Sequence, residues 1–197
     1  MKNNTSGMNN KKLGLMLVPI FAVLLGFSAF ATSFDTSSSI PQINDKTTVT
    51  GHVILQVFDT STGELKFKQE NHNLVVDGGL DEMAQAIFGV GGVGSTFFDY
   101  IEIGTGTTAP TAGDTTIETS ACARIQDASP DVNSSISGQT SVSVISSFDG
   151  GTCAGGITEA GVFNGLAGGQ MLARSTFGVV TIGSGDTLNV NYTVTIT

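Results

Sequence analysis

Tryptophan is absent from this 197-residue chain, which has only 4 prolines and 2 histidines. Charged residues make up 13 % of it, about half the usual quarter. Basic residues are the scarcest of these, with 8 Lys and Arg against 17 Asp and Glu and a formal net charge of -9. A nucleic-acid-binding surface needs many basic side chains to neutralise phosphates, so we exclude DNA and RNA as partners.

The residues that are abundant favour β-structure. Glycine accounts for 26 residues, roughly twice its average share, and Thr, Ser and Val are also frequent. Apolar residues reach 40 %, which is too many for a disordered chain. The composition differs from that of a helical bundle and predicts a β-rich domain with many turns.

The N-terminus has the features of a secretory signal peptide. Lys2, Lys11 and Lys12 precede an uncharged, mostly apolar run over residues 13–30. Ala29 and Ala31 fit the small-x-small cleavage pattern, so we predict removal of residues 1–31 and a secreted, extracellular or cell-surface product. An uncleaved membrane anchor is the alternative, because the run is about as long as the shortest bilayer-spanning helices. In the cleaved form the chain meets the membrane only during export.

Cys122 and Cys153 are the only cysteines. An even pair in an exported chain predicts a disulfide between them. Two free thiols or a thiol site are the alternatives. No Cys-x-x-Cys motif occurs, and no histidine is near either cysteine in the sequence.

The mature chain divides into an arm and one domain. Residues 32–48 are polar, contain Pro41 and predict an extended N-terminal arm. Residues 49–197 predict an antiparallel β-sandwich of jelly-roll or immunoglobulin-like kind. A helix is expected only at residues 80–88, where apolar residues recur at helical spacing before Gly89. Apolar–polar alternation predicts about eight strands, at residues 49–57, 65–70, 97–103, 117–126, 140–148, 157–163, 170–180 and 188–196.

Few residues are candidates for catalysis. His52 is placed within a strand and His72 in a turn, and neither accompanies a nucleophile motif. Most aspartates are placed in turns, which they commonly form, so a carboxylate pair for hydrolysis is the weaker interpretation. We therefore predict no catalytic site, no cofactor and no metal site, with Ca²⁺ at the Asp-rich loops left open.

Two glutamates are unusual because they fall within predicted strands. Glu102 and Glu159 occupy strand positions, and Glu159 is expected to form a structural ion pair with Arg124 or Arg174, the only arginines in the chain.

Two other short motifs have less specific interpretations. Asn133 and Asn191 each begin an N-glycosylation triplet, and Asn133, placed in a loop, is the better acceptor candidate. Gly104-Thr105-Gly106 is interpreted as a turn at a strand end, because no phosphate-loop lysine follows it.

Several segments resemble structural proteins of phage-type tails and tail fibres. The resemblance covers about residues 70–197 and involves structural turns, not catalytic signatures. It implies a β-sandwich structural protein, with Arg124 as the arginine that follows the Gly-x-Gly and Thr-Ala-Pro turns. The matching segments are residues 73–80, 101–110 with Asp114 and Thr115, 157–163, 171–177 and 186–188.

The signal peptide and the predicted disulfide depart from a virion protein. An exported β-domain with a free arm is similar to subunits of donor-strand-complemented filaments, such as archaeal bundling pili and biofilm-matrix fibres. That resemblance implies a homopolymer in which the arm of one subunit adds a strand to the next. An adhesin or carbohydrate- or Ca²⁺-binding module in contact with a cell surface or glycan, and a virus-like tail or spike component, are the alternative hypotheses.

Overall fold

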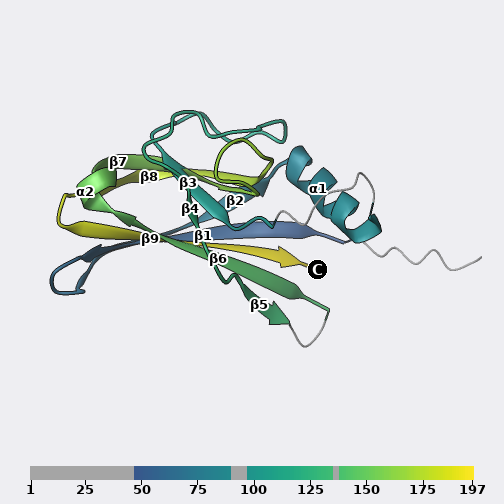
Figure 1. Ribbon diagram of the computed structural model, residues 1–197, viewed down its shortest axis with the longest axis horizontal. Helices are drawn as coiled ribbons and strands as arrows, with labels where there is room; N and C mark the ends of the chain where they lie inside the picture. The colour runs from purple at the N-terminus through teal and green to yellow at the C-terminus, as the bar shows by residue number, and fades with distance from the viewer. Residues whose placement is uncertain (1–46, 90–96, 135–137) are drawn as a thin grey trace, which may run out of the picture. The chain divides into compact units, whose positions relative to one another are not determined.

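The computed structural model describes residues 47–89, 97–134 and 138–197, drawn in colour in Figure 1. The predicted signal peptide, its cleavage signal at Ala29 and Ala31, and all of the predicted arm except Thr47 and Thr48 lie outside these residues.

The described residues form a mostly antiparallel β-structure, which confirms the all-β prediction. Nine strands form one sheet in the order β4-β3-β7-β8-β2-β1-β9-β6-β5, and every neighbouring pair is antiparallel. The strands are β1 (Val49–Asp59), β2 (Leu65–Val75), β3 (Tyr100–Gly104), β4 (Ile125–Gln126), β5 (Asp131–Ser134), β6 (Thr140–Asp149), β7 (Gly155–Phe163), β8 (Met171–Ile182) and β9 (Asp186–Ile196). The helices are α1 (Asp77–Phe88) and α2 (Gly150–Cys153).

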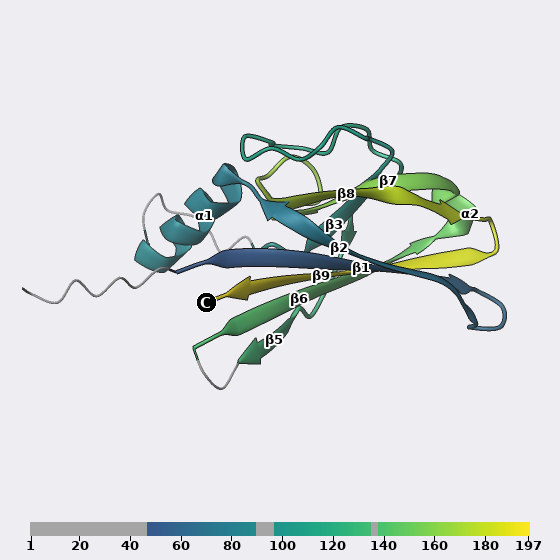
Figure 2. The same cartoon turned by 180° about the vertical axis from the view of Figure 1, so that it is seen from behind.

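The sheet curls so that its two ends face each other across one apolar core (Figures 1 and 2). β8 and β2 connect the two halves through only two residue pairs, Leu74↔Arg174 and Val75↔Ala173. Alternate residues of β1 and β9 point inward, as their periodicity predicts. Val53, Leu55 and Tyr192 are among these buried residues.

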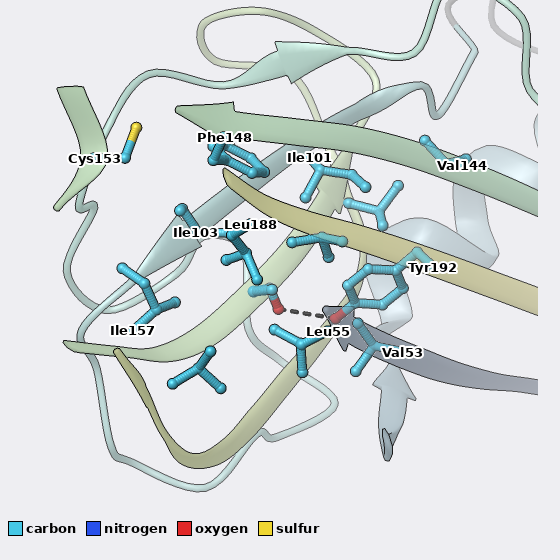
Figure 3. Packing of buried hydrophobic residues seen from close by; sticks show 14 of the residues in the cluster. Val53, Leu55, Ile101, Ile103, Val144, Phe148, Cys153, Ile157, Leu188 and Tyr192 are labelled. Atoms are coloured by element: carbon cyan, nitrogen blue, oxygen red, sulfur yellow. Dashed lines mark hydrogen bonds between the residues drawn. The ribbon is translucent and has the colours of Figure 1, made fainter. Parts of the chain in front are cut away.

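Inward-facing residues of β3 and β7 complete the core from the other half of the sheet (Figure 3). Ile101, Ile103 and Ile157 are buried there. The hydroxyl of Tyr192 donates a hydrogen bond to the carbonyl oxygen of Ala160 at 2.9 Å. This bond satisfies a polar group that is completely enclosed, and burial raises the pKa of the Tyr192 hydroxyl.

Helix α1 begins three residues earlier than the sequence predicts, at Asp77. Gly79 allows this, because a Cβ at that position would lie 2.6 Å from the Cα of Leu172 in β8. Gly89 ends the helix with φ 64°, a left-handed conformation that favours glycine. Only Gly79 of the helix is buried, and Ile87 and Phe88 are 73 % and 78 % exposed.

Four other expectations differ from the structure. Within the expected strand at residues 117–126, only Ile125–Gln126 is a strand. His72 lies inside β2 and not in a turn. The sequence pattern also missed β5, where Asn133 lies, and the single turn of α2. Short elements of this kind offer too few residues for a periodic signal.

Candidate functional site

A buried ion pair between Glu159 of β7 and Arg174 of β8 organises one side of the domain. Arg174 Nη2 and Nε donate to Glu159 Oε2 at 2.8 and 3.0 Å. Arg174 Nη1 donates to Asp114 Oδ2 at 2.8 Å. Glu159 is 0 % exposed and Arg174 3 % exposed. Of the two partners that the sequence allowed for Glu159, the structure selects Arg174.

The Glu159 carboxylate also binds the Gly104–Gly106 turn and the first residues of the segment expected as a strand at 117–126. It accepts N–H donors from Gly106 at 2.7 Å, Glu118 at 3.0 Å and Thr119 at 2.9 Å. Burial raises the pKa of Glu159, but these N–H groups and the Arg174 guanidinium outweigh it, so the pKa lies below its ordinary value. Pairing of this segment with β3 is limited to an isolated bridge between Gly104 and Ser120. The amides of Glu118 and Thr119 bind the carboxylate instead, so no continuous strand forms there.

Gly104 and Gly106 form the strand-end turn beside this ion pair. A Cβ on Gly106 would lie within 3 Å of the Glu159 carboxylate. The turn therefore needs glycine for close approach to a carboxylate of the same chain. This role accounts for the Gly-x-Gly motif without a ligand.

Arg124 forms a separate interaction with Glu102 of β3. Its Nε donates to Glu102 Oε2 at 2.7 Å, and its guanidinium lies 3.4 Å from the ring centroid of Phe163. Its Nη1 donates to the carbonyl oxygens of Gly165 at 2.8 Å and Gly168 at 2.6 Å. The contacts with Gly165 and Gly168 hold the loop between β7 and β8, and those with Glu102 and Phe163 tie it to β3 and the end of β7. The geometry of Arg124 is therefore that of a structural residue.

The structure contains a disulfide between Cys122 and Cys153, whose Cα atoms are 5.6 Å apart. It connects the loop bound by Glu159 to α2, and Cys153 is 5 % exposed in the core. Asp149 caps α2 by accepting the N–H of Gly151 at 3.1 Å. The bond therefore links two segments that have little regular structure of their own.

The two glycosylation candidates have different surroundings. Asn133 lies exposed on β5, an edge strand of the sheet and not the expected loop. Asn191 lies within β9, paired with Ile54 of β1 and Ile145 of β6. An enzyme that modifies the folded domain would reach Asn133 more easily than Asn191.

Neither histidine is part of an acid–base arrangement in the described residues. His52 Nε2 lies 3.9 Å from Glu70 Oε2 on the outer face of the sheet. The carbonyl of His72 accepts the Ser175 hydroxyl at 2.9 Å. No group of three or more His, Cys, Asp or Glu side chains suited to a metal ion occurs within residues 47–89, 97–134 and 138–197.

A cavity of about 540 Å³, which the sequence did not predict, lies at one end of the core. Its lining is almost entirely apolar. Val144, Tyr192 and Val194 belong both to this lining and to the core cluster, so the cavity continues the core outward. Phe97 and Val132 also line it and are 69 % and 66 % exposed. The volume lies in the range of small-ligand pockets, about 300–1,000 Å³.

Two features of the backbone lie beside this cavity. Val132 belongs to β5, the last strand in the sheet order. Thr48, the last residue of the predicted arm, exchanges two main-chain hydrogen bonds with Thr197, at 2.7 and 2.9 Å. Ile196 lines the cavity and pairs with Val49, so the start of β1 lies at this end of the domain. No local pattern predicts this cavity, because its lining comes from α1, β5 to β9 and the loops at residues 97–99 and 128–130.

Within the described part of the chain, neither helix combines the length and the apolar character needed to cross a membrane. Comparison of the chain with protein-family models, curated proteins and solved structures finds no match.

Proposed function

We propose that this chain is a secreted, non-enzymatic structural subunit that assembles into an extracellular filament or surface matrix. In this proposal the N-terminal arm, residues 32–48, adds a strand to a neighbouring subunit. The two facing parts of the curled sheet act as the layers of a β-sandwich. Export depends on the predicted signal peptide.

The observation that carries the proposal is the open apolar cavity at the end of the core. Exposed Phe97 and Val132 and enclosed Val144 form one continuous apolar surface. Covering apolar surface stabilises by about 25 cal/mol per Å². If an apolar segment of another subunit fills the cavity, it covers this apolar surface and therefore stabilises the folded subunit.

The arm has the side chains to fill such a cavity. Phe34, Ile40 and Ile43 are its large apolar residues, separated by polar ones. An edge strand such as β5 presents main-chain N–H and C=O groups to an incoming strand. Main-chain hydrogen bonds would supply affinity, and the apolar side chains would supply specificity.

Deletion of residues 32–46 tests this proposal. Thr47 and Thr48 are retained, because Thr48 is hydrogen-bonded to Thr197. We expect the exported variant to unfold cooperatively as a monomer and to form no filaments in electron micrographs. A peptide spanning residues 32–46, added in excess, is expected to raise its melting temperature. Filaments that persist after the deletion would contradict strand donation by the arm.

A cavity variant provides the matched test. Val142→Phe places a larger side chain in the lining of the cavity, whereas Val179→Phe makes the same change at a residue of β8 that is 64 % exposed. Polymerisation should be lost in the first variant and retained in the second. Equal polymerisation of the two variants would exclude the cavity as the acceptor.

A binding module is the second candidate, and the same cavity favours it. The apolar lining suits an apolar ligand better than a carbohydrate. In that case, arm deletion leaves both the oligomeric state and ligand binding unchanged. A virus-like tail or spike component is distinguished by co-purification of the protein with particles.

A further inference from the structure

Strand β2 has an open edge that faces away from β1. It pairs with β1 from Leu65 to Asn73, but with β8 only at Leu74 and Val75. Figure 2 shows β2 and β8 separating toward the β1–β2 hairpin. The remainder of this edge is a second candidate interface, separate from the free edge of β5 at the end of the sheet order.

The direction of the main-chain groups on β2 follows from one hydrogen bond. Val76 N–H, just after the strand, donates to the carbonyl oxygen of Leu172 at 3.0 Å, on the β8 side. Because alternate residues of a strand direct their amides to opposite edges, even-numbered residues of β2 point away from β1. His72 fits this pattern, since its carbonyl accepts the Ser175 hydroxyl.

The seam between β2 and β8 is closed by side chains where the two backbones separate. Asn71 Nδ2 donates to the carbonyl oxygen of Thr176 at 2.7 Å. Beyond this point, the outward main-chain groups of Lys68 and Glu70 have no main-chain partner among the described residues. Lys66 falls at the register irregularity opposite Val57 and Phe58, so the regular open edge is residues 68–70.

We propose that this edge docks against the same edge of a second copy of the chain. Antiparallel pairing about a two-fold axis at Gln69 places Lys68 opposite Glu70 of the second copy, and Glu70 opposite its Lys68. These even-numbered residues direct their N–H and C=O groups at each other, so the pairing forms regular ladder hydrogen bonds.

The charges on this edge match only in that arrangement. Lys68 Nζ and Glu70 Oε1 form an ion pair at 2.7 Å within the strand, with side chains 47 % and 52 % exposed. In the proposed dimer each side chain exchanges this exposed partner for the opposite charge of the second copy. A register shifted by two residues places Lys68 opposite Lys68 of the second copy, or Glu70 opposite its Glu70, and like charges directly opposite each other destabilise a pair of strands. Lysine on an edge strand usually prevents pairing, but here Glu70 supplies its complement.

The other face of the edge adds apolar contact. Phe67 and Leu65 are 40 % and 45 % exposed on the inward face of β2. The two-fold pairing at residues 68–70 brings Phe67 to the end of the paired segment and extends the sheet across both subunits. The expected product is a weak dimer of isolated subunits, or a side-by-side pairing of filaments if the arm also polymerises the chain.

Reciprocal charge reversal tests this interface. Lys68→Glu and Glu70→Lys each place like charges opposite each other in a homodimer. We expect each variant alone to associate on the order of tenfold more weakly than the unchanged protein, because two pairs change from attraction to repulsion. An equimolar mixture of the two variants restores opposite charges at both pairs and should recover association.

The readout is sedimentation velocity of the isolated exported protein, over a range of concentrations. Thermal unfolding of each variant establishes that it is folded. As a control for net charge, Lys68→Glu is mixed with Asp81→Lys, a change at an exposed position of α1. That mixture should not associate more than its components.

Recovery in the first mixture alone supports the β2 interface. Three results would overturn the proposal. The original protein could remain monomeric, the single variants could associate as strongly as the original protein, or both mixtures could recover association equally. Electron micrographs of the same samples report separately on arm-dependent filaments. Failure of the filament proposal and failure of the β2 interface therefore give different results.

Discussion

Glu159 and Arg174 lie diagonally across β7 and β8, where Arg174 is opposite Gly161 and Glu159 is opposite Thr176. Their side chains meet at 2.8 Å while both residues are almost fully enclosed. One carboxylate thereby connects two strands and the loop at residues 106–119. Four predictions about the domain follow from this and neighbouring contacts.

Replacement of Glu159 by glutamine should destabilise the domain strongly. Glu159→Gln removes the negative charge and leaves the guanidinium of Arg174 buried with only Asp114 and Glu118 as charged partners. Breaking a buried pair from one side typically costs about 3–5 kcal/mol, which denaturant unfolding measures. The control is Glu118→Gln, whose side chain is 43 % exposed and whose charge is screened by solvent, so that its loss should destabilise the domain far less. Equal effects would contradict the assignment.

Stability should fall in acid. The pKa values of Glu159 and Asp114 lie below their ordinary values, because hydrogen bonds and Arg174 outweigh the effect of burial. The unfolded chain therefore binds protons at a higher pH than the folded chain, and stability present at neutral pH is lost as the pH falls below about 4. Urea unfolding between pH 7 and pH 3 measures the loss. In the Asp114→Asn variant the free energy of unfolding should depend less on pH. If the original protein has the same free energy of unfolding at pH 3 as at pH 7, the prediction is wrong.

Two adjacent glycines of α1 should respond oppositely to alanine. A Cβ at Gly79 meets the Leu172 main chain at 2.6 Å, so Gly79→Ala must displace the helix from β8. We expect a cost of about 1–3 kcal/mol. At Gly78 the nearest neighbour is the Gln170 side chain at 3.2 Å, and alanine there favours the helix by up to about 1 kcal/mol. Melting temperatures of the two variants compare these effects, and a stabilising Gly79→Ala would show that the helix packs differently.

Loss of the disulfide should destabilise the domain without changing its fold. The bond closes a segment with a sequence separation of 31, for which the chain-entropy model gives about 3–4 kcal/mol. A variant with serine at both Cys122 and Cys153 should unfold at lower denaturant concentration than the oxidised protein. Reducing agent should lower the stability of the unchanged protein and leave the serine variant unaffected. An effect of reducing agent on both would show that it acts elsewhere.

The sequence by itself determined the strands that have one enclosed face. Residues 188–196 alternate strictly, and β9 has the predicted inward side chains because a period of two is imposed by the pleated backbone. The same reasoning located β1 and β6. It also identified Glu159 as unusual, since a glutamate among inward-facing strand residues needs a charged partner.

Only the tertiary structure decided how the remaining segments are arranged. Arg174 and Arg124 are equivalent partners for Glu159 in the sequence, and strand pairing alone determines which one reaches it. Residues 117–124 alternate like a strand, but Glu159 binds the amides of Glu118 and Thr119. The apolar cavity and the open edge of β2 arise where distant strands converge or separate. Such features depend on how strands that are distant in the sequence pair with each other, and the local alternation of residues does not predict that pairing.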